Sequence, residues 1–189
     1  MSLVLVTKPA APPVGVLELR EHLRIVDAAE DQQLGRYLEA VLGEVDGPGG
    51  WFGQALLTQT WDWALDGFPC GKDWTLYPPL PPLQSVTSIK YLDTAGVEQT
   101  LSALDYDVDA KSLPGRIRPA YGKTWPSTRM IMNAVTVRLV GGYGNAAAVP
   151  SDIRNAIIDR VALLYLRRGE GVPTRSDARL DARRLMGPS

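Results

Sequence analysis

The sequence predicts an α+β fold, a small helical bundle of two N-terminal helices plus a C-terminal helix with a β-rich insertion. Apolar residues recur at helical spacing before residue 46 and again after residue 150. Between them, over about residues 56–144, they alternate at strand spacing and are interrupted by glycine and proline. We expect an extended N-terminal arm at 1–15, one main domain at 16–168 and a flexible, arginine-rich C-terminal tail at 169–189.

Length and composition are ordinary for a globular protein. The 189 residues are 45% hydrophobic and 22% charged, with a net charge of −1, so total charge points to neither nucleic acid nor a membrane. Cys70 is the only cysteine, which excludes an internal disulfide and fits a reducing compartment. No apolar run approaches the ~18 residues that span a bilayer, so we expect no membrane partner.

The N-terminal elements are set by prolines, caps and glycines. Three prolines bar a helix from the arm, and apolar residues on one face predict a first helix over Val16–Leu23. Asp27 and Glu30 form a capping-box pattern for a second helix, whose apolar spacing continues to Val45. The run Gly47–Gly50 ends it.

The β-rich part begins with a tryptophan-rich strand. Leu57, Gln59, Trp61, Trp63 and Leu65 point one way, which is the period of a half-buried strand. Four prolines within residues 78–82 predict a stiff extended connector. After it come a hairpin, two short strands and one longer strand, predicted over residues 86–101, 106–108, 116–118 and 135–140.

A third helix follows Pro150 and is predicted to reach Arg168. We expect Ile157 and Val161 to be core residues packed on the Leu38 and Leu42 face of the second helix. One more short helix is predicted around residues 177–186.

Catalytic and metal-binding patterns are weak. His22 has no second histidine to form a zinc site or triad with, and Cys70 has no neighbouring base in the sequence. Asp62 and Asp66 lie on one strand face, where they are a hypothesis for a hydrolase and otherwise solvated charges. The glycines of residues 141–144 lack a phosphate-loop pattern and predict a tight exit turn. We therefore expect no enzyme, cofactor or metal.

The five tryptophans suggest an alternative function in ligand binding. A surface platform of them would bind a carbohydrate or another ligand by stacking, although tryptophans in a small β module more often fill a core or an interface. The five are Trp51, Trp61, Trp63, Trp74 and Trp125.

Charge is separated along the chain. Residues 17–46 carry eight acids and three arginines, a net charge of −5, and residues 110–151 carry six bases and no acid. We call these the acidic segment and the basic segment. Opposite segments suit head-to-tail association, in which one face of a protomer meets a different face of the next. The subunit-interface hypothesis places Glu39 and Glu44 opposite Arg116 and Arg118.

The order of motifs resembles the head–tail connector (adaptor) proteins of tailed bacteriophages and prophages. The motifs are LxLxEHLRI, LLTQTWDWALDGFP, PPLPPLQSVTSIKYLDTAGVEQTL, LPGRIRPAYGKTWP, VTVRLVGGYG and VPSDIRNAIIDRVALLY, and they span roughly residues 15–168.

This resemblance implies a non-enzymatic structural virion protein at the head–tail junction, present in the host cytoplasm during assembly. Such proteins form a homo-oligomeric ring, commonly of twelve subunits, that binds the portal protein and presents a surface to a stopper or tail-completion protein. Double-stranded DNA passes through the lumen without sequence-specific binding. In the family the C-terminal helical segment reaches the portal, which makes Arg179, Arg183 and Arg184 the expected portal contacts.

Overall fold

In the computed structural model, residues 2–71 and 73–167 are described, and they divide into two compact units. Of these residues, one unit contains 2–9, 58–71 and 73–142, and the other contains 10–57 and 143–167. We call them the sheet unit and the helical unit. Helices and antiparallel sheets occur together in the chain, which confirms the predicted α+β class.

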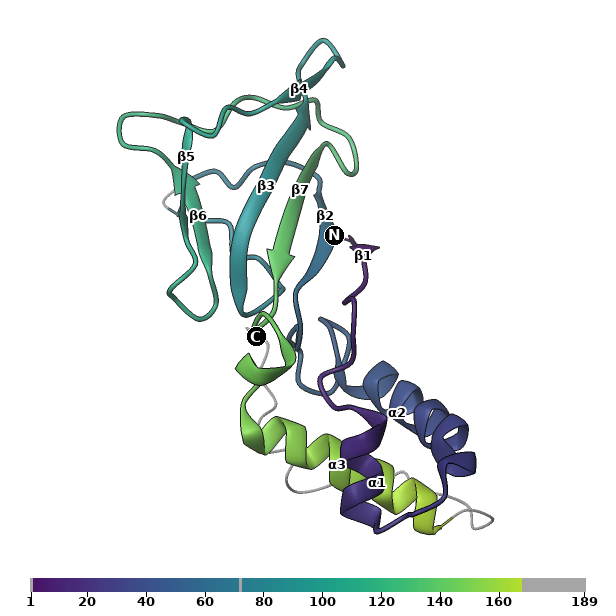
Figure 1. The fold of residues 1–189 in the computed structure, drawn as a ribbon. Coiled ribbons are helices and arrows are strands. Elements are labelled where there is room, and N and C mark those ends of the chain that lie inside the picture. Colours follow the sequence, from purple (N-terminus) through teal and green to yellow (C-terminus); the bar gives the residue numbers. More distant parts are fainter. Residues whose placement is uncertain (1, 72, 168–189) are drawn as a thin grey trace. The chain divides into compact units, whose positions relative to one another are not determined.

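The sheet unit is built on a five-stranded antiparallel sheet with the order β1-β2-β7-β3-β4. β2 and β7 are paired without irregularity from Gln59 opposite Gly141 to Leu65 opposite Val135. Figure 1 shows β7 between β2 and β3. The strands are β1 (Ser2–Thr7), β2 (Gln59–Leu65), β3 (Leu83–Leu92), β4 (Glu98–Thr100) and β7 (Val135–Gly141).

A second, two-stranded sheet belongs to the same unit. It pairs β5 (Tyr106–Asp109) with β6 (Arg116–Pro119), as the sequence predicts. An isolated bridge joins Leu76 to Ile117, so the short apolar run after the tryptophan-rich strand packs on this ribbon. Both residues are buried.

The proline-rich connector is part of the core of the sheet unit. Leu80, between its prolines, is fully buried, and the Pro82 carbonyl accepts a hydrogen bond from the Gly142 amide at 2.9 Å. Gly142 has a φ of 118°, a left-handed conformation that glycine adopts without penalty. The predicted exit turn at the end of β7 is therefore confirmed, and it fixes the connector against the sheet.

The helical unit contains three α-helices that contact one another, α1 (Val16–Leu23), α2 (Asp31–Val45) and α3 (Ser151–Leu166). α2 begins later than the capping pattern predicts. The Asp27 carboxylate accepts a hydrogen bond from the Ala29 amide and starts a 3-10 turn, Ala28–Glu30, before the helix. A second 3-10 turn, Ala146–Ala148, precedes α3.

The core of the helical unit confirms the predicted packing of the second and third helices. Leu38, Ile157 and Val161 belong to one buried cluster, and Leu42 is half-buried against it. α3 ends at Leu166, close to the predicted bound. The short helix expected around residues 177–186 lies outside the described residues. In the described part of the chain, no helix is long and apolar enough to cross a membrane.

Candidate functional site

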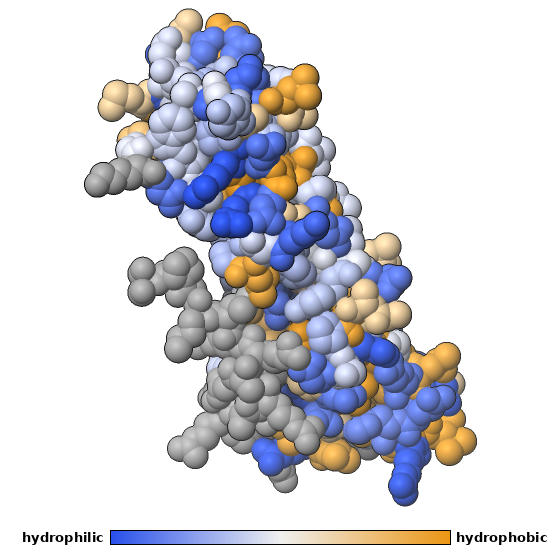
Figure 2. Space-filling view, turned by 90° about the vertical axis from the view of Figure 1, so that its left-hand side faces the viewer, coloured by the Kyte–Doolittle hydropathy of each residue, from blue (hydrophilic) through white to orange (hydrophobic). Residues whose placement is uncertain are grey.

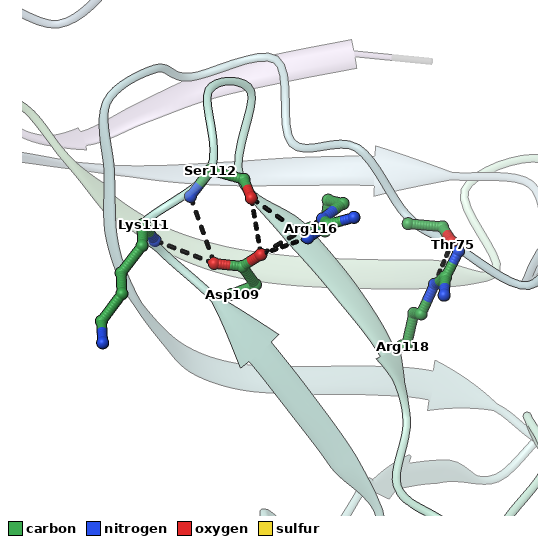
Figure 3. Close-up of polar contacts among 6 residues, drawn as sticks. All are labelled: Thr75, Asp109, Lys111, Ser112, Arg116 and Arg118. Carbon is green, nitrogen blue, oxygen red and sulfur yellow. Dashed lines mark hydrogen bonds and ion pairs between the residues drawn. The ribbon is translucent and has the colours of Figure 1, made fainter.

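Arg116 on β6 is held by an aspartate of the neighbouring strand. Its guanidinium donates to the Asp109 carboxylate at 2.6 and 3.2 Å and to the Ser112 hydroxyl at 3.1 Å (Figure 3). Asp109 also accepts from the amides of Lys111 and Ser112 and from the Ser112 hydroxyl. The Ser112 hydroxyl, followed by Arg116, holds the pKa of Asp109 well below its usual range. This cluster fixes the turn between β5 and β6 and orients Arg116.

Arg118 lies two residues further along β6 and has different partners. Its guanidinium donates to the Thr75 hydroxyl, as Figure 3 shows, and lies 3.7 Å from the Asp73 carboxylate. The side chains of Arg116 and Arg118 remain 45% and 59% exposed despite these contacts. Both arginines are therefore positioned by their own unit and are still open to an acidic partner.

The acidic candidates lie on α2. Glu44 is 3.4 Å from Arg160 of α3, with its side chain 56% exposed, and Glu39 is exposed on the same helix. The Glu44–Arg160 pair links α2 to α3, and the pair between Arg154 and Glu18, at 2.7 Å, links α3 to α1. Part of the acidic segment thus stabilises the helical packing.

The two charged segments are partly neutralised inside their own units. In the basic segment Arg116, Arg118, Lys123 and Arg138 each lie within ion-pair distance of an aspartate of the sheet unit. Glu18, Asp31 and Glu44 of the acidic segment pair with arginines of the helical unit. The face shown in Figure 2 carries hydrophilic side chains with separate small hydrophobic groups between them. Each segment therefore presents a weaker electric field to a partner than its formal charge alone would produce.

The hydrolase candidates are engaged in structural contacts. Arg138 of β7 donates to both Asp62 oxygens at 2.8 Å, and Asp66 accepts from the Asn133 amide at 2.9 Å. The Arg138 hydrogen bonds lower the pKa of Asp62. A glycosidase acid needs the opposite shift, toward protonation at neutral pH. The geometry of Asp62 and Arg138 supports a role in strand pairing rather than in acid catalysis.

The other titratable candidates stand apart from one another. His22 on α1 has its Nε2 atom 3.9 Å from Asp159 on α3, and Cys70 is exposed in the loop after β2. Among the residues that the structure describes, no three histidine, cysteine or acidic side chains are grouped to hold a metal ion.

The tryptophans are divided among several packing environments. Trp63 is buried in the sheet unit, and Trp51 is half-buried against the core of the helical unit. Trp125 stacks on Phe68 with 4.7 Å between ring centroids, and its indole nitrogen donates to the Trp74 carbonyl. Trp61 is half-buried on β2, and Trp74 is 41% exposed. The packing of Trp51, Trp63 and Trp125 supports a structural role for these three residues.

The exposed side chains of the edge strand β1 form a surface that was not predicted from the sequence. β1 is an edge strand, and its side chains Val4 and Val6 are 59% and 45% exposed. The available signal was an uncharged run, Ser2–Thr7, rich in β-branched and aliphatic residues.

The expected portal contacts Arg179, Arg183 and Arg184 lie outside the described residues.

Chains in three solved structures of phage-like particles are similar to this chain over almost its full length. The neck of an empty GTA particle, computed with C6 symmetry, contains a chain with 26% identity and a TM-score of 0.77, covering 100% of this chain and 98% of that one. The virion of a native gene transfer agent particle gives the same values. The neck of a native GTA particle, computed with C12 symmetry, matches with 24% identity and a TM-score of 0.68, which shows the shared fold. No protein-family model matches the chain, and no curated protein is a significant match.

Proposed function

We propose that this protein is a structural neck subunit that forms a ring joining the portal of a phage-like particle to its tail or stopper. The observation that carries the proposal is the full-length likeness to a chain in the neck of a GTA particle, with a TM-score of 0.77. The order of motifs, similar to that of head–tail connectors, supports the same role. In this proposal the helical bundle carries the β-rich part as an insertion, and the protein acts in the virion after assembly in the host cytoplasm.

A cyclic ring requires two different faces on each protomer that match after one fixed rotation. The C6 symmetry of the matching neck supports such an arrangement. The head–tail connectors that the motif order resembles commonly have twelve subunits. We assign Glu39 and Glu44 to one face and Arg116 and Arg118 to the other. Because three of these four side chains already have partners within their unit, they would set register more than affinity.

The C-terminal tail, residues 169–189, is proposed to bind the portal through Arg179, Arg183 and Arg184. Packaged double-stranded DNA would pass through the ring lumen without base-specific contacts. A stopper or tail-completion protein would bind the opposite surface of the ring.

Deleting the gene in the strain that produces the particle tests the role as a whole. We expect DNA-filled heads and separate tails in electron micrographs, and joined particles when the gene is restored on a plasmid. An Asp62→Asn copy should restore joining as well as the native gene does, because no chemistry is assigned to that carboxylate. Joined, infectious particles in the deletion strain would contradict the proposal.

The portal contact has its own test. Replacing Arg179, Arg183 and Arg184 with alanine should abolish co-sedimentation with purified portal while the melting temperature stays that of the native protein. Removal of residues 170–189 should have the same effect. Normal co-sedimentation of both variants would show that the portal is bound by another surface.

A further inference from the structure

The first strand of the protein is attached to the sheet unit along one side only. β1 pairs antiparallel with β2, with Ser2 opposite Ala64, Leu3 opposite Trp63 and Leu5 opposite Trp61. Among the residues that the structure describes, no strand pairs with its other side, because β1 is the edge of the five-stranded sheet. Figure 1 shows this strand at the N-terminal end of the chain, beside β2.

β1 contributes no fully buried side chain to the core. Val4 and Val6 are exposed, and Leu3 and Leu5 are only half-buried, whereas Trp63 on the paired strand is 3% exposed. The remaining core of the sheet unit comes from β2, β3, β7 and the segments packed on them. Main-chain hydrogen bonds to β2 are thus the chief attachment of β1, and a strand held in this way opens at low free-energy cost.

The segment that follows β1 favours separation from its own sheet. Lys8 and residues 10–12 are exposed, and the chain is next anchored at Pro13 and Val14, which are both buried, Val14 in the core of the helical unit. Pro9 and Pro12 fix their own φ angles and so restrict the conformations of this linker, which bends at residues 10 and 11. When fully extended, the five residues 8–12 would span about 17 Å, which gives the arm reach beyond its own anchor.

We propose that in the assembled ring β1 of each copy pairs with β2 of the next copy, in the register that it has with its own β2. This inference rests on the proposed ring. The exchanged strand keeps every main-chain hydrogen bond of the closed form, so the exchange costs little enthalpy and links the subunits. One copy donates the arm and the next accepts it, which is the heterologous contact that a closed ring needs. The accepting edge is β2, residues 60–64, and its complement is the N-terminal strand of a second copy.

Cysteine pairs at Ser2 and Ala64 give a direct test. Opposed Cα atoms of antiparallel strands are about 4.5–5.5 Å apart, within the range of about 4.4–6.8 Å that a disulfide bridges. In a Cys70→Ser background, Ser2→Cys protein is mixed with Ala64→Cys protein, and the mixture is oxidised before and after assembly into rings or onto portal. We expect covalent dimers only after assembly. A mixture of Ser2→Cys with Thr94→Cys, in the turn between β3 and β4, should give none.

The double variant Ser2→Cys/Ala64→Cys tests whether strand exchange is required for ring assembly. Oxidation of the monomer locks β1 onto its own β2, so ring assembly should be lost and then restored by a reducing agent. If the protein is oxidised after assembly, covalent chains of many copies should appear on a non-reducing gel.

Native mass measured on the same samples separates this inference from the proposed function. Rings that contain only intramolecular disulfides, or locked monomers that assemble normally, would overturn the exchange and leave the ring role intact. Equal linking in the Thr94→Cys control would overturn the register. Absence of rings in every sample, with and without portal, would contradict both proposals.

Discussion

Arg138 binds Asp62 across the central strand pair of the sheet unit, donating two hydrogen bonds of 2.8 Å to the carboxylate. The two side chains stand directly opposite each other on β7 and β2, on the face away from Trp61 and Trp63. A pair in this position reinforces strand register, and the lowered pKa of Asp62 does not suit the general acid of a glycosidase.

We expect Asp62→Asn to lower the melting temperature by a few degrees at neutral pH, because the pair is partly exposed and pairs of this kind contribute modestly. Arg138 lowers the pKa of Asp62, so the stabilisation is present above the unfolded-state pKa and disappears as pH falls through the folded-state pKa. The native protein and the variant should therefore converge below about pH 4. Melting curves from pH 3 to 8 check this, with Glu98→Gln as an exposed-pair control; a difference that grows toward low pH would refute it.

Ile157→Asp should destabilise the helical unit by about 4 kcal/mol or more, because it places an unpaired charge in a closed core. Ile157 is 0% exposed within the buried cluster of the three helices. Leu166→Asp on the same helix is the matched control, since Leu166 is 73% exposed. Urea denaturation measures both. Equal stabilities of the two variants would show that this face of α3 is not in the core.

Gly141→Ala should lower stability by about 1–3 kcal/mol, the range for overpacking a core. A Cβ at residue 141 would lie 2.8 Å from the side chain of Leu80, which is fully buried, and 3.1 Å from the Leu80 carbonyl oxygen. Gly43→Ala, in the exposed last turn of α2 with no atom within 4 Å of the new Cβ, should instead stabilise by about 0.5–1 kcal/mol. We expect the denaturation midpoint to fall for Gly141→Ala and to rise for Gly43→Ala. A stabilising Gly141→Ala would mean that the connector does not pack on the end of β7.

The elements with strong local patterns were predictable from the sequence. α1 has the bounds that apolar spacing predicts, and β7 alternates between buried Val135, Val137 and Leu139 and less buried neighbours. Such elements are determined by residues that are close in sequence. The start of α2 differs because the Asp27 carboxylate accepts from the Ala29 amide and so begins a 3-10 turn, Ala28–Glu30, before the helix.

The partners of charged residues were not predictable in the same way. Arg138 and Asp62 are separated by 76 positions, and Arg154 and Glu18 by 136, so their pairing depends on the fold and not on local spacing. Counting charge by segment therefore overstated the field that each segment presents. The strand β1 was expected only as an extended arm, because its pairing comes from the free edge of β2 rather than from its own pattern.

Ring assembly should weaken between low and high salt if the proposed charge contacts help to join the subunits. The Debye length falls from ~10 Å at 0.1 M to ~3 Å at 1 M salt. Arg116→Glu/Arg118→Glu protein should remain folded and monomeric, although it also loses contacts to Asp109 and Asp73. Mixing it with Glu39→Arg/Glu44→Arg protein should restore part of the association. Sedimentation velocity checks both effects; rings that persist unchanged in 1 M salt and in the arginine variant would remove these residues from the interface.

The ring itself is tested most directly by native mass measurement of the purified protein alone and with purified portal. The protomer has a mass of 20.6 kDa, so each added copy is resolved. We predict a complex in which one closed ring of copies, six or twelve in the proposed role, is bound to one portal assembly. A protein that stays at the protomer mass beside an unchanged portal, at micromolar concentrations of both, would contradict the proposed function.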